Sequence, residues 1–278
     1  MFLKAPFRNE RGFFYGILIL PALYSMRLLY LLLPVISISS CQEAAPDSFT
    51  KPNPPIPESP ATLNGIQVPD GFTRLSAAPG SFTHWLRSLP CKKNKTVYLY
   101  DGRVKSNQQA QFAVLDLGPV SRLQQCADVV IRLRAEFLFA TGQYDSIRFT
   151  DFEQGQYKWT GGNNRVQFDR YLQQVFGMCG SASLEKQMHP VIPFQDIQPG
   201  DVLVHGGFPG HALIVADMAV NEKGEKVFLL IQGYMPAQDI HVLVNPLDPE
   251  RGPWFSIPST DSIYTPEWIF HQQALHRW

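Results

Sequence analysis

The sequence has few cysteines, no excess of either charge and no long run of charged residues. Four cysteines among 278 residues are too few for a disulfide-dense scaffold. Lysine plus arginine and aspartate plus glutamate both number 24, which leaves no net basic field for a nucleic-acid partner. A hydrophobic fraction of 45% excludes a disordered or collagen-like chain. What remains is an ordinary folded protein of one large domain or two small ones.

One long apolar segment lies near the amino terminus. Residues 12–38 are almost wholly apolar, with Arg27 as the single charge, and the run ends in the letters ISSC, whose cysteine is Cys41. An aliphatic residue and two small residues before a cysteine resemble the signal of bacterial lipoproteins. In that resemblance, cleavage before Cys41 leaves its thiol to carry the lipid. The alternative is an uncleaved membrane helix, because about 20 apolar residues suffice to span a bilayer.

The export signal divides the chain into three parts. Residues 1–41 are predicted to be the signal peptide, with Met26 as an alternative start that gives a more compact signal. Residues 42–66 are rich in proline and polar side chains and are expected to run as an extended spacer. The protein is therefore expected to face the periplasm of the cell envelope on a lipid anchor, in either the inner or the outer membrane.

The rest of the chain, residues 67–278, is expected to form a single α+β domain. Apolar residues at helical spacing predict a helix over residues 121–140 and a second over residues 168–176. Short apolar runs between turn residues predict strands over 96–100, 110–117, 202–204, 211–216, 226–232 and 240–244. Helices in the middle and antiparallel strands at the end are typical of an α+β fold.

Three residues suggest a thiol-based active site. Cys126 lies in the first long predicted helix, His211 begins a predicted strand after a glycine-rich turn, and Gln232 ends the next strand. A thiol nucleophile needs a base within hydrogen-bond reach and a third polar group that orients the base. A helix that carries the cysteine and a sheet that carries the other two residues would meet these requirements.

The residues around His211 carry a family resemblance. Gly-Asp-Val-Leu-Val at residues 200–204, a turn, and then Gly-His-Ala-Leu-Ile-Val at residues 210–215 resemble the histidine motif of the NlpC-type cell-wall hydrolases. That resemblance implies a papain-like fold, with a helix packed on an antiparallel sheet, and a cysteine peptidase or amidase that acts on peptidoglycan peptides. It implies Cys126 as the nucleophile, His211 as the general base and Gln232 as the polar orienting group, with no cofactor.

The sequence departs from this family in two respects. The separation of Cys126 and His211, 211 − 126 = 85 residues, exceeds that of compact members, so residues 143–195 would be an insertion. Gln-Cys-Ala replaces the usual Asp-Cys-Ser/Gly context. The whole of residues 67–278 also resembles a family of bacterial lipoproteins described as a domain of unknown function (number 4846), which implies no activity.

Each candidate residue also has a purely structural interpretation. Cys126 could be a core residue on the inner face of its helix, His211 a core histidine at a turn, and Gln232 a structural amide. The alternative function is then a noncatalytic envelope lipoprotein that binds a ligand or joins an assembly. Trp159 and Tyr234 are predicted to line the substrate groove of the enzyme.

Two further possibilities concern cysteine and histidine chemistry. Cys91 and Cys179 could form a disulfide in an oxidising periplasm, although nothing in the sequence places them together. His205 and His211 lie close in sequence, but without a nearby pair of carboxylates they make a poor zinc site. The sequence therefore predicts no metal.

Overall fold

The computed structural model describes residues 59–278. The predicted signal peptide over residues 1–41, the lipidation site Cys41 and most of the predicted spacer lie outside the described residues. Within residues 59–278, no helix is long and apolar enough to cross a membrane. Leu63 and Ile66, at the end of the predicted spacer, are buried in the hydrophobic core.

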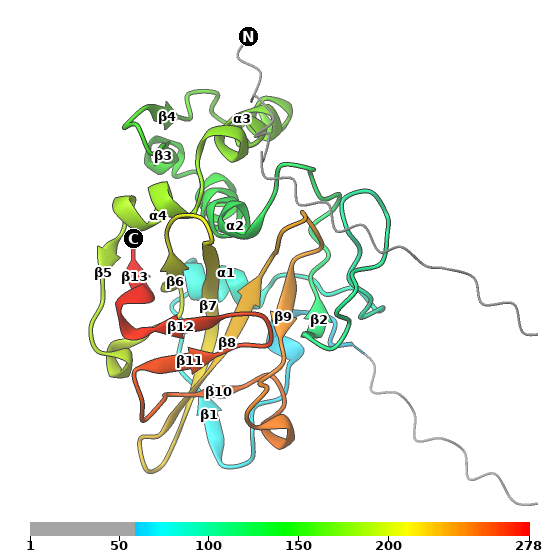
Figure 1. Cartoon of the computed structure of the whole chain (residues 1–278), viewed down its shortest axis with the longest axis vertical. Helices are drawn as coiled ribbons and strands as arrows, with labels where there is room; N and C mark the ends of the chain where they lie inside the picture. The colour runs from blue at the N-terminus through cyan, green and yellow to red at the C-terminus, as the bar shows by residue number, and fades with distance from the viewer. Residues whose placement is uncertain (1–58) are drawn as a thin grey trace, which may run out of the picture. The chain divides into compact units, whose positions relative to one another are not determined.

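An antiparallel sheet of nine strands forms the centre of the described structure (Figure 1). The order along its main path is β2-β9-β8-β7-β6-β13-β5, and β1 pairs with β7 while β10 pairs with β8. Its strands are β1 (Phe72–Arg74), β2 (Gln111–Val114), β5 (His189–Pro190), β6 (Val202–His205), β7 (His211–Asn221), β8 (Lys226–Gln232), β9 (His241–Leu243), β10 (Phe255–Ser256) and β13 (Leu275–Arg277). Two separate ribbons consist of β3 (Arg148–Thr150) with β4 (Gln156–Lys158), and β11 (Ser262–Tyr264) with β12 (Ile269–His271).

Four α-helices accompany the sheet. They are α1 (Phe82–Arg87), α2 (Cys126–Ala140), α3 (Arg165–Met178) and α4 (Ser181–Gln187). Five short 3-10 helices cover Leu63–Gly65, Tyr144–Ser146, Phe194–Asp196, Pro249–Arg251 and Gln272–Ala274. The Ser81 hydroxyl caps α1, because it accepts a hydrogen bond from the backbone N–H of His84 at 3.2 Å. Helix α2 packs on β7 and carries the apolar face that covers the sheet.

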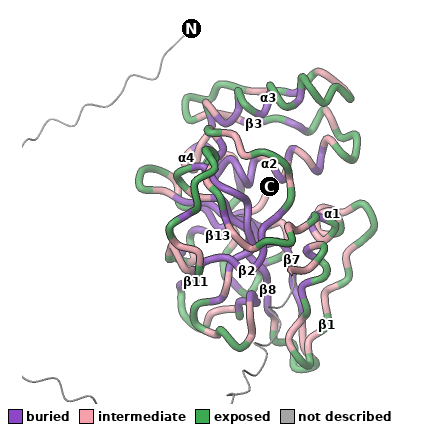
Figure 2. The backbone as a smooth tube through the Cα atoms, turned by 90° about the vertical axis from the view of Figure 1, so that its right-hand side faces the viewer, coloured by how far each residue is buried: buried purple, intermediate pink, exposed green. Residues whose placement is uncertain are grey.

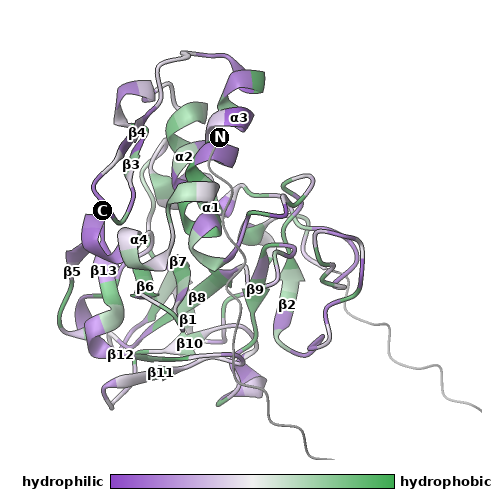
Figure 3. Ribbon diagram, turned by 45° about the horizontal axis from the view of Figure 1, so that its top comes forward, coloured by the Kyte–Doolittle hydropathy of each residue, from purple (hydrophilic) through white to green (hydrophobic). Residues whose placement is uncertain are grey.

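The sheet is buried on both faces, which explains why its long strands are apolar almost throughout. Every residue of β7 from His211 to Ala219 is buried, and buried residues gather along the same strands in Figure 2. Ala212 and Ile214 belong to the core formed with the helices, whereas Leu213 and Val215 belong to a second core. The second core includes residues of the β11–β12 ribbon, so that ribbon covers the face opposite the helices. The hydropathy colouring of Figure 3 shows the apolar character of β6, β7 and β8.

The predicted papain-like fold is wrong. Helices and strands are both present, but the architecture is a broad antiparallel sheet of nine strands, and a papain-like packing of a helix on a sheet is not evident. Residues after 244, for which no strand was predicted, add β10, β11, β12 and β13. These strands have only two or three residues, too few to produce a recognisable alternation of apolar and polar side chains. The predicted strand over 96–100 contains only isolated bridges.

A buried ionic cluster fixes the amino-terminal elements to the longest strand. Asp217 of β7 is fully buried, and its carboxylate accepts hydrogen bonds from Arg74 of β1 at 2.7 Å and from Arg87 of α1 at 2.6 Å. A second terminal N–H of Arg87 donates to the backbone oxygen of Leu75. One carboxylate therefore holds β1 and α1 against β7.

Candidate functional site

Helix α2 begins at Cys126 and not at residue 121 as predicted. The backbone N–H of Gln125 donates to the Asp128 carboxylate at 2.8 Å, which caps the helix at that point. The preceding residues form a turn closed by the hydrogen bond from Gln124 N–H to Ser121 O. Cys126 therefore lies in the first turn, where backbone N–H groups are unpaired and the helix dipole favours negative charge.

The start of α2 meets the ends of two neighbouring strands. The backbone N–H of Ala212, the residue that follows His211 in β7, lies close enough to the Cys126 thiol to lower its pKa. Gly233, directly after Gln232, permits a close approach of the helix, because a Cβ there would lie 2.5 Å from a methyl carbon of Val129. The structure thus places Cys126 at the end of the central strands β7 and β8 that also carries His211 and Gln232.

The hydrogen bonds of Gln232 determine which ring nitrogen of His211 carries the proton. Gln232 Oε1 lies 2.9 Å from His211 Nε2, while Gln232 Nε2 donates to the Glu267 carboxylate at 2.7 Å and lies 3.2 Å from His241 Nε2. Both amide hydrogens are therefore used, and Oε1 can only accept. His211 Nε2 must carry the proton, which leaves Nδ1 with a free lone pair.

A buried polar network continues behind Gln232. Lys105 Nζ forms an ion pair with Glu267 at 2.7 Å, and the Asn107 amide donates to the same carboxylate at 3.2 Å. His241 Nδ1 lies 2.9 Å from the backbone oxygen of Asp239, so it carries the proton and its Nε2 accepts from Gln232. Sequence reasoning missed Lys105, Glu267 and His241. No motif surrounds them, and only the tertiary fold brings them to Gln232.

Aromatic rings surround the imidazole of His211. Its ring centroid lies 5.0 Å from that of Tyr234, 5.5 Å from that of Trp268 and 5.8 Å from that of Phe270. His211 is only 2% exposed, whereas Cys126 and Tyr234 are half-buried. Tyr234, predicted to contact substrate, therefore lies beside the imidazole and reaches the surface.

Trp159, the other residue predicted to contact substrate, lies elsewhere. Its ring packs against Phe139, Phe168 and Tyr171, and its indole N–H donates to the backbone oxygen of Gly162. Phe139 is 13 residues after the start of α2, or about 20 Å along the helix axis. The structure therefore places Trp159 in the core between α2 and α3 and does not bring it to Cys126.

Within residues 59–278, the two other cysteines are free thiols. Cys91 and Cys179 are not joined to each other. Burial raises the pKa of Cys91 to about 11 and that of Cys179 to about 12. Both are therefore protonated at neutral pH.

Burial keeps the Cys126 thiol and the imidazoles of His211 and His241 uncharged near neutral pH. Removal from water lowers the pKa of His211 to about 4 and that of His241 to about 3. It also raises the pKa of Cys126, although the backbone N–H of Ala212 acts in the opposite direction. The resting pair is therefore a thiol and a neutral imidazole whose Nδ1 can take up a proton.

The two buried histidines predict a loss of stability in acid. Their folded-state pKa values lie below the ordinary value of 6.5, so the unfolded chain binds more protons as the pH falls from about 6.5 to about 4. The free energy of unfolding should decrease over this window, by at most about 1.4 kcal/mol per pH unit for each histidine. Urea unfolding as a function of pH measures this slope. In His241→Gln the slope should be about half as steep, and an unchanged slope would contradict the assignment.

Comparison with known proteins gives a family and no activity. A family model described as "Domain of unknown function (4846)" matches residues 63–166 and 154–277, which together cover most of the chain. No curated protein and no solved structure matches this chain. The chain therefore belongs to the family described as domain of unknown function 4846.

Proposed function

We propose that this protein is a thiol-dependent hydrolase of amide bonds. The observation that carries the proposal is the bonding of Gln232, whose amide is held by Glu267 and His241 and presents Oε1 to His211. This arrangement leaves the Nδ1 lone pair of His211 available to accept a proton. The Cys126 thiol lies in the first turn of α2, and the backbone N–H of Ala212, the residue after His211, lowers its pKa.

The proposed reaction follows from these positions. Cys126 Sγ attacks the carbonyl carbon of the amide while its proton passes to His211 Nδ1. The carbonyl oxygen becomes an oxyanion, which backbone N–H groups in the first turn of α2 stabilise. His211 then gives its proton to the departing nitrogen as the C–N bond breaks and a thioester forms. Water, deprotonated by His211, hydrolyses the thioester and restores the thiol.

The proposed substrate is a peptide of the peptidoglycan. Support comes from the resemblance of the residues around His211 to the histidine motif of cell-wall hydrolases and from the predicted lipoprotein signal that ends at Cys41. Exposed apolar side chains at the same end of β7 and β8 could contact a peptide. Phe208, in the turn before His211, is 91% exposed, and Met235, soon after Gln232, is 51% exposed.

The experiment uses the full-length protein in nonionic detergent micelles. Peptidoglycan fragments are incubated with the protein, and newly formed amino and carboxyl termini are identified by mass spectrometry. Alkylation that is mapped to Cys126 should abolish their formation, whereas a sample alkylated only at Cys91 should remain active. Absence of new termini with every fragment would refute the proposed reaction.

The pH dependence of alkylation tests the resting state of the thiol. Because burial raises the pKa of Cys126 and leaves His211 neutral, labelling by iodoacetamide should accelerate steadily as the pH rises toward and beyond 9.0. Mapping by mass spectrometry separates Cys126 from Cys91 and Cys179. A fast plateau near pH 6 would instead show a thiolate–imidazolium pair and would contradict the neutral pair.

Burial favours a second candidate function. Since His211 is 2% exposed and His241 is fully buried, the same network could serve only to stabilise this end of the sheet's central strands. The protein would then be a noncatalytic envelope lipoprotein that binds a peptide or joins an assembly. In that case, Cys126→Ala would keep ligand binding intact, and no covalent intermediate would form with any amide.

A further inference from the structure

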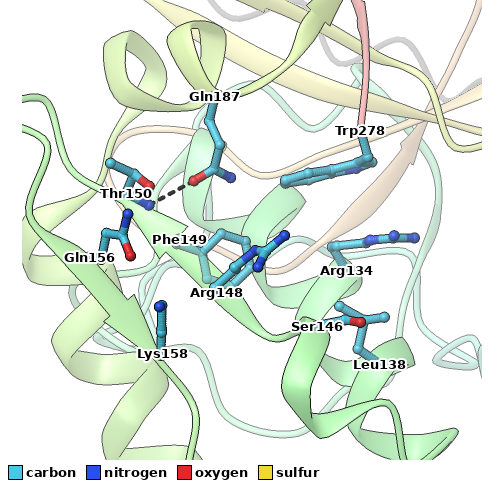
Figure 4. Close-up of a pocket in the computed structure, with 10 residues that line it drawn as sticks. All are labelled: Arg134, Leu138, Ser146, Arg148, Phe149, Thr150, Gln156, Lys158, Gln187 and Trp278. Carbon is cyan, nitrogen blue, oxygen red and sulfur yellow. Dashed lines mark hydrogen bonds between the residues drawn. The ribbon is translucent and has the colours of Figure 1, made fainter.

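A second site lies apart from Cys126, beside the later turns of α2 that carry Arg134 and Leu138. It is a pocket of about 390 Å³ between α2, the β3–β4 ribbon, α4 and the end of the chain. Figure 4 shows the residues that line it, among them Arg134, Arg148, Lys158, Phe149, Gln187 and Trp278. Arg134 is eight residues after Cys126, or about 12 Å along the helix axis.

All charged side chains that line this pocket are positive. Arg134, Arg148 and Lys158 supply three cations, and no aspartate or glutamate lines the pocket. Within residues 59–278, none of these three side chains forms an ion pair or donates a hydrogen bond to a protein acceptor, in contrast to Arg165, which pairs with Glu136 and Asp169. The pocket is therefore electrostatically uncompensated.

Two of the cations lie directly opposite each other. In the two-stranded ribbon, Arg148 of β3 is the register partner of Lys158 of β4. Like charges at opposed positions of an antiparallel pair destabilise it. The ribbon is nevertheless held in place, because the Tyr171 hydroxyl donates to Tyr157 O and Thr150 N–H donates to Gln187. An anion between Arg148 and Lys158 would remove the repulsion.

The third cation is positioned before any ligand binds. The Arg134 guanidinium lies 5.4 Å from the ring centroid of Phe82, 5.7 Å from that of Phe137 and 5.7 Å from that of Trp278. Burial lowers its pKa, because no carboxylate offsets the loss of water. A bound anion would supply the missing partner and could accept two parallel hydrogen bonds from the guanidinium.

Two further groups of the pocket, the Gln187 amide and the Trp278 indole, carry N–H donors with no protein acceptor in the described residues. Gln187 Oε1 accepts from Thr150 N–H at 2.7 Å, and Figure 4 shows its amide nitrogen turned to the opposite side, toward Trp278. The indole N–H of Trp278 is buried and has no acceptor in the described part of the chain. Phe149, Leu138 and the Trp278 ring form an apolar wall.

We propose that this pocket binds a phosphate ester. Arg134, Arg148 and Lys158 would hold the phosphate, whose two negative charges suit a site with three cations, and the organic part would pack on Trp278, Phe149 and Leu138. The volume exceeds that of a bare phosphate and admits a small organic group. The phosphate ester is either a soluble metabolite or the headgroup of a phospholipid, and the two sources share the same chemistry.

The test is calorimetric titration of the full-length protein in nonionic detergent micelles with inorganic phosphate. Arg148→Gln and Lys158→Gln should each weaken binding about tenfold, the effect of losing one charge-assisted hydrogen bond. Lys223→Gln, an exposed substitution in the turn between β7 and β8, is the matched control and should not change the affinity. Absence of binding beyond that of chloride at equal ionic strength, or equal binding by all variants, would overturn the proposal.

A stability measurement keeps the test independent of ligand affinity. Without phosphate, Lys158→Gln should raise the melting temperature, because it removes the repulsion with Arg148. It should also abolish the rise in melting temperature that phosphate gives to the unmodified protein. Displacement of phosphate by phenyl phosphate identifies a soluble source, and displacement only by micelles that contain phosphatidic acid identifies a lipid headgroup. A lower melting temperature of Lys158→Gln would count against the proposed repulsion.

Discussion

Replacement of His211 by alanine is expected to lower kcat/KM for amide hydrolysis about 10⁴-fold. In the proposed reaction the imidazole takes the proton from the Cys126 thiol. Because burial raises the pKa of that thiol, the reaction has no other source of thiolate near neutral pH. Cys126→Ala should cause a loss at least as large. The double variant should be no worse than the single variants, because the two side chains act in one step.

The controls for this prediction come from the same residue types. His189→Ala alters an exposed histidine of β5, and Cys91→Ala removes a thiol outside the network, so both should retain activity. Steady-state kinetics on a peptidoglycan fragment measure kcat and KM separately. If His211→Ala and His189→Ala had equal activity, His211 would not be the general base.

Replacement of Asp217 by alanine is expected to lower the free energy of unfolding by about 3 to 5 kcal/mol. The Asp217 side chain is 0% exposed, while those of its partners Arg74 and Arg87 are 20% and 13% exposed. Removal of the carboxylate leaves two guanidinium groups largely buried without a counter-charge. The contacts that hold β1 and α1 against β7 would be lost at the same time.

Urea unfolding followed by tryptophan fluorescence measures this loss. Asp217→Asn preserves the size of the side chain and removes its charge, so it should also be strongly destabilised. Asp101→Ala removes a carboxylate that pairs with Arg103 on the surface and should leave stability unchanged. A small effect of both Asp217 variants would show that the buried cluster contributes little to stability.

The strands that carry the candidate site were the part of the fold most readily predicted. The predicted strands over 202–204, 211–216, 226–232 and 240–244 correspond to β6, β7, β8 and β9. Most of their residues are buried, so each strand is largely an apolar run. Turn residues at 206–210 and 221–224 separate these runs, and these local signals are sufficient to locate strands.

The start of α2 illustrates what local patterns cannot give. The predicted helix over 121–140 ends correctly at Ala140 but begins five residues too early. Apolar periodicity does not distinguish a first turn from the loop before it, and the capping bond from Gln125 to Asp128 decides the start. That detail matters for function because it moves Cys126 into the first turn.

The sequence by itself determined which residue types carry the candidate chemistry and in which order along the chain. Cys126, His211 and Gln232 could be proposed because each stands next to a helix or strand whose pattern is local. Only the tertiary structure decided that a nine-stranded sheet, and not a papain-like fold, positions them. It alone placed Glu267 behind Gln232 and Arg148 opposite Lys158. These contacts join residues whose pairing depends on the register of strands and loops, and no local periodicity encodes that register.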